Sequence, residues 1–396
     1  MEKIIIFTGK GGVGKTSIAA AHARHSALNG VKTLILSTDM AHNLGDVFGL
    51  SLGKKITHIS QNLDALEIDP NYIMENDFSD IKKGIAEMFQ SSSRPLGEME
   101  QISLFPGMDE LFSLLKIKSV YEEGVYERII VDCAPTGETL ALLKFPELLS
   151  WYIEKFLPVG KFAMRVLSPI SKKMFKIQLP NKEAMSDVER LFVELIALQE
   201  LLKDKNVTSI KLVSMPEKMV VEETKRSFMY MNLYNFNVDG IYINRILPRD
   251  IDNSFFDEWI VSQNQYIEEL EIVFGKIPIY KVPWFDCALN GLDGVDLIEN
   301  VLRNMDVFRI VEMEESEEYI KLENGYLLKM YLPNIDKADL NMHETNSDII
   351  IKIGNFKRSI PKPNVLRNHE ITDAKLENQI LKITLIKKQK GNEEYE

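Results

Sequence analysis

Cysteine is scarce in this chain of 396 residues. Its two cysteines, Cys133 and Cys287, lie far apart in the sequence. This spacing excludes a disulfide framework and favours a reducing compartment. The chain also has no C-x-x-C pair, and its six histidines are scattered. We therefore expect neither a zinc site nor an iron–sulfur cluster.

Long apolar runs are absent as well, and acidic residues outnumber basic residues. No stretch approaches the roughly 20 apolar residues of a membrane-spanning helix. The first apolar run, Ile4–Phe7, is too short for a signal peptide. The formal net charge of −12 disfavours nucleic acid and anionic membrane surfaces as partners. We expect a cytoplasmic protein without stable membrane insertion, with enough hydrophobic residues (45%) for sizeable cores.

The N-terminal part of the chain alternates apolar strands with helical stretches. Lys3–Phe7, a glycine-rich loop, an Ala-rich helix over Thr16–Asn29 and the strand Thr33–Ser37 make one βαβ unit. Such alternation predicts an α/β fold with a doubly wound, mostly parallel sheet. Further strands are expected at Leu63–Ile68, Arg128–Val131, Ser209–Ser214, Gly240–Asn244 and Lys276–Val282.

Two other regions have their own patterns. Residues from about 71 to 118 and from about 147 to 204 are rich in Met, Phe and Leu, and we expect them to be helical insertions in an N-terminal domain covering 1–311. After an acidic linker at 312–318, short alternating strands separated by turn residues predict a small all-β sandwich over 319–396.

The glycine-rich loop carries the clearest chemical signal. Its eight residues match G-x-x-x-x-G-K-[ST] between a strand and a helix: Gly9, Lys10, Gly11, Gly12, Val13, Gly14, Lys15 and Thr16, followed by Ser17. Backbone N–H groups of such a loop surround phosphate oxygens, and the helix N-terminus favours the same anions. We expect Lys15 to bridge the β- and γ-phosphates of ATP and the Thr16 hydroxyl to bind Mg²⁺.

Two aspartates follow predicted strands. Asp39 comes two residues after Ser37, the end of the strand Thr33–Ser37, and is suited to orient or deprotonate the attacking water and to contact Mg²⁺; a helix N-cap is the alternative. Asp132 has the Walker B position and is expected to hold Mg²⁺ directly or through water. The turn that follows it, with Pro135 and Gly137, is suited to respond to the γ-phosphate.

Lys10, directly after the first glycine, resembles the signature lysine of deviant Walker A ATPases related to septum-site, plasmid-partition and nitrogenase iron proteins. In that class this lysine reaches the nucleotide of the partner subunit, which implies a homodimer. A cation placed there neutralises charge on the transferring phosphoryl group. The alternative is a solvated surface lysine.

Residues 37–48 (S-T-D-M-A-H-N-L-G-D-V-F) and 132–143 (D-C-A-P-T-G-E-T-L-A-L-L) resemble switch I and switch II of one family. It comprises the arsenical-pump ATPase and the ATPase that delivers tail-anchored membrane proteins. The segments Glu67–Pro70, Phe105–Glu110 and Val282–Phe285 agree with it.

The resemblance implies that Asp39 is the catalytic aspartate and that Asn244 hydrogen-bonds adenine. It also implies that Pro283, Trp284 and Phe285 pack near the base. A strand-end cap is the alternative for Asn244.

The C-terminal region resembles the α-crystallin domain of small heat-shock proteins, as fused to a subset of this family. The likeness rests on Tyr326–Pro333, Lys337–Leu340 and Phe356–Pro361. An unrelated small sandwich is the alternative.

The chain departs from the family pattern in three ways. Met40 replaces the proline usual after the switch I aspartate, and Glu138 replaces a histidine in switch II. The third departure is the missing C-x-x-C pair, without which the dimer needs another means of association.

These features predict a Mg²⁺-dependent ATPase that cycles between ATP and ADP and works as a dimeric switch. Methionine adapts to varied apolar partners, so the Met-rich helices favour binding of hydrophobic protein segments, although plain core packing would give the same pattern. The main alternative is an anion or arsenite pump subunit with a membrane-associated partner. A positioning ATPase and an iron–sulfur reductase fit less well, because the chain is acidic and lacks suitable cysteines.

Overall fold

In the computed structural model of the chain, the described residues are 3–39, 43–77, 108–133, 187–275, 277–309, 311, 317–345, 348–362 and 364–388. Contacts between Cα atoms divide the chain into two units. The first comprises Met1–Pro146, Pro180–Phe228 and Phe236–Glu312. The second comprises Glu147–Leu179, Met229–Asn235 and Met313–Glu396.

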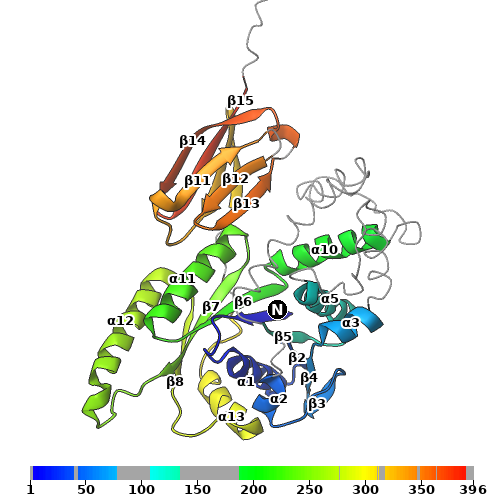
Figure 1. Cartoon of the computed structure of the whole chain (residues 1–396), viewed down its shortest axis with the longest axis vertical. Coiled ribbons are helices and arrows are strands. Elements are labelled where there is room, and N and C mark those ends of the chain that lie inside the picture. Colours follow the sequence, from blue (N-terminus) through cyan, green and yellow to red (C-terminus); the bar gives the residue numbers. More distant parts are fainter. Residues whose placement is uncertain are drawn as a thin grey trace, which may run out of the picture. The chain divides into compact units, whose positions relative to one another are not determined.

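The first unit is built on one eight-stranded sheet in the order β3-β4-β2-β5-β1-β6-β7-β8 (Figure 1). All neighbours pair in parallel except β3 and β4, so the fold is the predicted doubly wound, mostly parallel α/β fold. The short edge strand β3 was not predicted, because its half-exposed residues show no apolar run. The strands are β1 (Ile4–Thr8), β2 (Thr33–Ser37), β3 (Thr57–Ser60), β4 (Leu63–Glu67), β5 (Arg128–Asp132), β6 (Thr208–Ser214), β7 (Val238–Ile246) and β8 (Ile279–Pro283).

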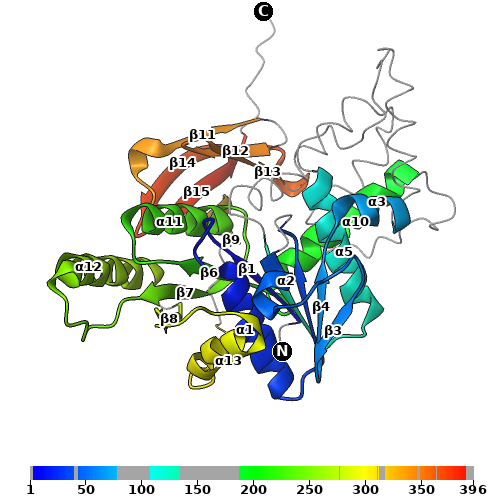
Figure 2. The same ribbon diagram turned by 60° about the horizontal axis from the view of Figure 1, so that its bottom comes forward.

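Helices cover both faces of this sheet. On one face α1 (Lys15–Leu28) packs against α2 (Asn43–Phe48) and α13 (Gly291–Leu302). On the other lie α3 (Pro70–Asn76), α5 (Met108–Glu123) and α10 (Asp187–Lys203) (Figures 1 and 2). The remaining helices are α11 (Lys218–Leu233), η3 (Ser254–Phe256) and α12 (Asp257–Phe274). None of the helices in the described part of the chain is long and apolar enough to cross a membrane.

The helix after the glycine-rich loop is held close to the sheet by small side chains. Ala19, Ala20, Ala21 and Ala23 of α1 are completely buried, so the helix approaches its neighbours without intervening bulk. It ends as predicted before Gly30, whose φ of 82° lies in the left-handed region. The start of α1, and with it the loop, is thereby anchored to the core.

The predicted helical insertions are described only in part. Helices α3, α5 and α10 lie within or next to the segments 71–118 and 147–204. Residues 78–107 and 134–186, which carry most of the Met-rich pattern, lie outside the described residues. The client-binding helices therefore stay a prediction.

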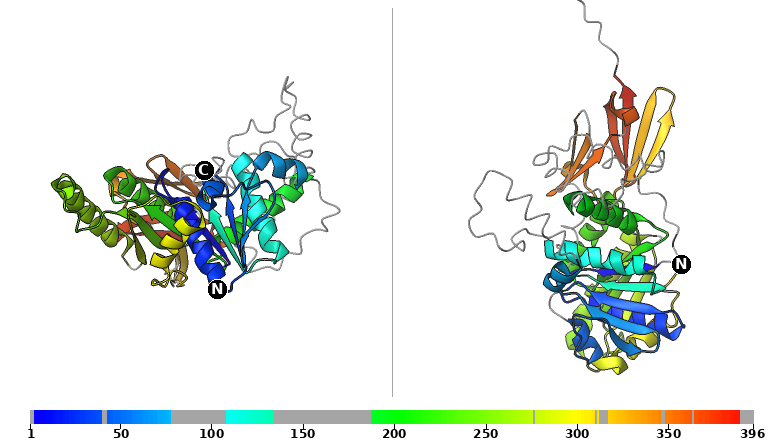
Figure 3. Two further views of the ribbon diagram at one scale, coloured as in Figure 1. Left: turned by 90° about the horizontal axis from the view of Figure 1, so that it is seen from below. Right: turned by 90° about the vertical axis from the view of Figure 1, so that its right-hand side faces the viewer.

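The second unit contains two antiparallel sheets, in the orders β14-β15-β10-β9 and β11-β12-β13. Their strands are drawn in orange to red in Figure 3. Leu381, Ile383 and Leu385 of β15 are buried and alternate with Lys382 and Thr384, so one face of the strand forms the core. The elements are β9 (Glu317–Leu322), β10 (Gly325–Tyr331), η4 (Lys337–Asp339), β11 (Leu340–Glu344), β12 (Asp348–Ile353), β13 (Phe356–Pro361), η5 (Asn364–Leu366), β14 (His369–Glu377) and β15 (Ile380–Lys387).

Two details differ from the prediction for this unit. β9 begins at Glu317, inside the predicted linker 312–318, because two acidic residues at an exposed strand end resemble a linker in sequence. β14 is mostly exposed, so it lacks the apolar alternation by which β15 could be recognised. The exact domain limits stay a prediction.

Candidate functional site

The candidate site lies where three neighbouring strands end. Asp132, the last residue of β5, is in register with Phe7 of β1 and with Ser37 of β2. The glycine-rich loop follows β1 and Asp39 follows β2. Because the strands are parallel, their carboxyl ends meet at one edge of the sheet, where ligands bind in α/β folds. The fold thus brings together the loop, Asp39 and Asp132.

The loop between β1 and α1 is open to anions. Gly11 and Gly12 are exposed, whereas Lys15 is buried, with its Nζ 3.4 Å from the carbonyl oxygen of Lys10. Gly14 precedes α1 as an N-cap without a side-chain hydrogen bond, and the first turn of α1 contains no acidic residue. The N-terminus of a helix that lacks a side-chain cap favours a bound anion.

The other loop and helix positions lie around this opening. Lys10, Thr16 and Ser17 are partly exposed, and Val13 is buried in the core beneath the loop. Gly9 passes so close to β6 that a Cβ would collide with the carbonyl oxygen of Val213. Glycine is therefore required at position 9 by close approach of two backbones.

Asp132 is a buried carboxylate with an unused oxygen. Its Oδ2 accepts a hydrogen bond from Ser37 Oγ at 3.3 Å, whereas Oδ1 has no hydrogen-bond partner among the described residues. Burial raises the pKa of Asp132 to about 6, although the neighbouring Thr16 hydroxyl and Lys15 ammonium favour its ionised form. An orphaned buried oxygen of this kind calls for a cation or a water.

This arrangement fits a magnesium ion. Mg²⁺ is usually held by one or two protein oxygens together with waters and substrate phosphates. Asp132, at the end of β5 and beside Thr16, offers such oxygens. No group of three or more His, Cys, Asp or Glu side chains able to hold a metal occurs in the described ranges.

Asp39 is held at the start of switch I. Its backbone N–H donates to Ser37 Oγ at 3.2 Å, and Asn43 Nδ2 donates to its Oδ2 at 3.4 Å. α2 begins at Asn43, four residues later, so Asp39 is not the N-cap of that helix. Met40 lies outside the described residues, as do the switch II positions Pro135, Gly137 and Glu138.

The motif Glu67–Pro70 has a local structural explanation. Glu67 Oε1 accepts from the backbone N–H of Gly45 at 2.8 Å and so ties β4 to α2. Asp69 caps α3 by accepting from the N–H of Tyr72 at 3.0 Å, and Pro70 fills the first helical position. The first contact holds α2, which lies within residues 37–48, and the other two fix the start of α3.

The predicted base-binding residues lie at the ends of β7 and β8. Asn244 is buried and its Nδ2 donates to the carbonyl oxygen of Val13 at 2.9 Å. Trp284 is 55% exposed, and its backbone N–H donates to the carbonyl oxygen of Ile246 at 2.9 Å. Phe285 is partly buried against the core that also contains Val282.

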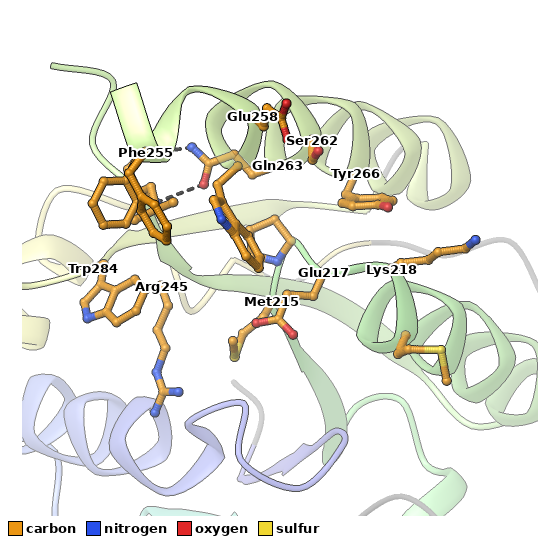
Figure 4. A pocket seen from close by; sticks show the side chains of 15 residues that line it. Met215, Glu217, Lys218, Arg245, Phe255, Glu258, Ser262, Gln263, Tyr266 and Trp284 are labelled. Carbon is orange, nitrogen blue, oxygen red and sulfur yellow. Dashed lines mark hydrogen bonds between the residues drawn. The ribbon is translucent and has the colours of Figure 1, made fainter. Parts of the chain in front are cut away.

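Trp284 lines a cavity of about 740 Å³ between these strand ends and helices α11 and α12 (Figure 4). Its lining is mainly aromatic and apolar with a few charged groups, as in small-molecule sites. The other lining residues include Met215, Arg245, Phe255, Trp259 and Tyr266.

Three features of the site were not predicted from the sequence. Ser37 joins Asp132 to the backbone of Asp39, although a serine at a strand end has no distinctive signal. Arg245 enters the cavity lining from a left-handed backbone conformation, with φ at 55°. The cavity itself combines residues more than 60 positions apart, and only folding brings them together.

Comparisons with known proteins identify the family of the chain. Residues 2–304 match the model of the anion-transporting ATPase family, and residues 323–385 match the HSP20-like domain found in ArsA. A putative arsenical pump-driving ATPase of Chlorobaculum tepidum is 33% identical over 385 residues, covering 96% of this chain and 95% of that protein. A second such protein, from Aquifex aeolicus, is 31% identical over 95% of this chain and 98% of its own length.

A relative with another name matches the N-terminal part. The ATPase ASNA1 homolog 1 of Paramecium tetraurelia is 30% identical over 302 residues, which are 74% of this chain and 90% of that protein. The matches to the Chlorobaculum tepidum protein and to this Aquifex aeolicus protein thus extend over the C-terminal sheets as well. The chain belongs to the anion-transporting ATPase family, and it is an ATPase that carries the HSP20-like domain found in ArsA.

Proposed function

We propose that the chain binds ATP with Mg²⁺ at the loop Gly9–Thr16 and hydrolyses it there as a homodimeric switch. The observation that carries the nucleotide assignment is the unpaired Oδ1 of buried Asp132, beside Thr16 and Lys15 at the edge of the sheet. A bound magnesium ion would neutralise charge on the phosphates. Asp132 and Thr16 are the residues proposed to hold it, with Asp39 nearby.

Each residue around the phosphate site has its own role in hydrolysis. Lys15 contacts the β- and γ-phosphates, and the N–H groups of Gly11–Thr16 with Ser17 line the phosphate cradle. Asp39 orients and deprotonates the attacking water. Lys10, partly exposed at the tip of the loop, reaches the nucleotide of the partner subunit.

The base occupies the part of the cavity next to Trp284. The exposed indole offers a flat face for the adenine, flanked by Pro283 and Phe285. Asn244 has a second N–H and a second oxygen lone pair, beyond those that it uses within the chain, and these would contact the adenine edge.

We further propose that the ATP cycle moves hydrophobic protein segments. The support is the abundance of Met and Phe in residues 71–118 and 147–204, together with the family membership. ATP favours the closed dimer and hydrolysis releases it, which biases a two-state apolar surface.

An Asp39→Asn variant tests this proposal, because it keeps the phosphate cradle and removes the carboxylate that deprotonates the attacking water. It is expected to bind Mg-ATP normally and to hydrolyse it at least about 100-fold more slowly. When it is loaded with ATP and incubated with a synthetic 20-residue apolar helix, a stable dimer–peptide complex is expected by size-exclusion chromatography. Wild-type protein with ADP is the control. Normal turnover by the variant would refute the role of Asp39, and absence of the complex would refute the client role.

The alternative is an ATPase subunit that energises an anion or arsenite transporter; two relatives are named putative arsenical pump-driving ATPases. A metalloid site needs soft thiolate ligands. Cys133 is buried at the end of β5 and Cys287 is exposed, so the two thiols have different surroundings. Stimulation of wild-type turnover by arsenite, lost in a Cys287→Ser variant, would favour the pump.

A further inference from the structure

Strand β7 contains a bulge at the edge of the nucleotide site. In its pairing with β8, Ile243 is in register with Lys281 and Ile246 with Pro283. Two residues of β7, Asn244 and Arg245, therefore face one residue of β8. A bulge changes the direction of the side chains that flank it. Arg245 has a φ of 55°, a conformation that costs a residue with a side chain of the order of 1 kcal/mol.

The bulge directs two adjacent side chains to different places. Arg245 lines the cavity, and Figure 4 shows its side chain extending from β7 toward the loop and α1. Asn244 is buried instead, and both functional groups of its amide are engaged. Its Nδ2 donates to Val13 O at 2.9 Å, and its Oδ1 accepts from the N–H of Arg245 at 2.9 Å. The strained residue thus helps to hold the amide in place.

The hydrogen bond to Val13 fixes one peptide plane of the phosphate loop. The carbonyl of Val13 and the N–H of Gly14 belong to the same planar trans peptide, so they point in opposite directions. With the carbonyl held toward Asn244, the N–H of Gly14 is turned away from β7 and is free to serve the phosphate cradle. Gly14 also has to be glycine for this contact, because a Cβ there would collide with Asn244 Nδ2.

We propose that Asn244 is a positioning residue that sets the Val13–Gly14 peptide for phosphate binding. This role rests on the proposed nucleotide site and is additional to the adenine contact. It makes a specific prediction: Asn244 contributes to the binding of a triphosphate that has no base. A residue that only reads adenine contributes nothing to such a ligand.

The test compares Mg-ATP with magnesium tripolyphosphate, each measured by displacement of a fluorescent ATP analogue from the full-length protein. Asn244→Ala removes one buried hydrogen bond to the loop, and we expect it to weaken both ligands by a similar factor, roughly five- to tenfold. Asn244→Asp keeps the acceptor for Arg245 but places a carboxylate oxygen against the Val13 carbonyl. We expect this second, nearly isosteric variant to weaken the binding of tripolyphosphate at least as strongly as Asn244→Ala does.

Two control variants separate this role from base binding and from general loss of structure. Trp284→Ala is expected to weaken ATP and to leave tripolyphosphate unchanged. Gln263 is also a buried amide, and it holds the backbone of Leu247 by two hydrogen bonds of 2.9 Å without touching the loop. Gln263→Ala is therefore expected to spare tripolyphosphate, although it too removes buried hydrogen bonds.

The outcomes are distinct. If Asn244→Ala and Asn244→Asp weaken ATP while tripolyphosphate binds as it does to the wild type, the positioning role is refuted and the adenine contact stands. If Gln263→Ala weakens tripolyphosphate equally, the loss is general and the positioning role is again refuted. If the wild-type protein bound neither Mg-ATP nor magnesium tripolyphosphate, the nucleotide site itself would be refuted.

Discussion

The burial of Asp132 predicts that removing its charge stabilises the nucleotide-free protein. Asp132 is 1% exposed, and burial raises its pKa from 3.8 to about 6. This difference corresponds to about 3 kcal/mol of unfavourable free energy for keeping the ionised carboxylate in the folded state. An Asp132→Asn variant has nearly the same shape, and its amide can still accept from Ser37. It should therefore gain up to about 3 kcal/mol at pH 8.

The sign follows from the two pKa values. Below about pH 3.8 the carboxyl group is protonated in both the folded and the unfolded state, so the aspartate and the asparagine differ little. Between pH 3.8 and about 6 the unfolded chain ionises first, and the wild type loses stability relative to the variant. Above about pH 6 the full difference is present. When a magnesium ion is bound together with nucleotide, the wild type should be more stable than Asp132→Asn, because only the carboxylate neutralises charge on the ion.

Urea unfolding followed by the fluorescence of Trp259 and Trp284, both in the first unit, measures this difference. The unfolding free energies of the wild type and the variant are compared at pH 4.5 and pH 8, without nucleotide and then with Mg-ATP. Asp252→Asn, at an exposed position, is the matched control and should change stability by less than about 0.5 kcal/mol. A nucleotide-free Asp132→Asn protein that is less stable than the wild type at pH 8 would refute the reasoning.

Three further predictions concern the same unit. Gly14→Ala should abolish detectable Mg-ATP binding in calorimetry, because its φ of 90° and the collision with Asn244 Nδ2 both oppose a Cβ; retained affinity would contradict this packing. Lys211 Nζ lies 2.8 Å from Asp239 Oδ1 with both side chains completely inaccessible, so Lys211→Met should lower the unfolding free energy by about 3–5 kcal/mol. The double variant Lys211→Met/Asp239→Leu should recover most of this loss in the same urea assay, and a double variant as unstable as the single one would show that the buried charge is not the cause. Burial holds the pKa of His22 well below 6.5, so the unfolded chain takes up a proton that the folded chain does not, and stability should fall as the pH drops below about 6.5. His22→Gln should flatten this part of the stability–pH curve, and an unchanged slope would exclude His22 as its source.

The elements that carry the site were predictable because they have strong local signals. Buried parallel strands such as β1 and β2 are nearly continuous apolar runs, and the glycine-rich loop between strand and helix has a known spacing. Asp39 and Asp132 could be singled out because each follows such a strand. β3 and β14 were missed because their exposed residues follow no apolar period.

The amino-acid sequence alone determined the fold class, the phosphate loop and the family resemblance, since these depend on local periodicity and on residue types at short spacing. Only the tertiary structure decided what surrounds those residues. It joined Asn244 to the carbonyl of Val13 across 231 positions, left Asp132 Oδ1 without a hydrogen bond among the described residues, and placed Arg245 beside Trp284 in a cavity. Such contacts depend on strand order, register and a bulge, which are set by the packing of the whole sheet and have no local signature in the chain.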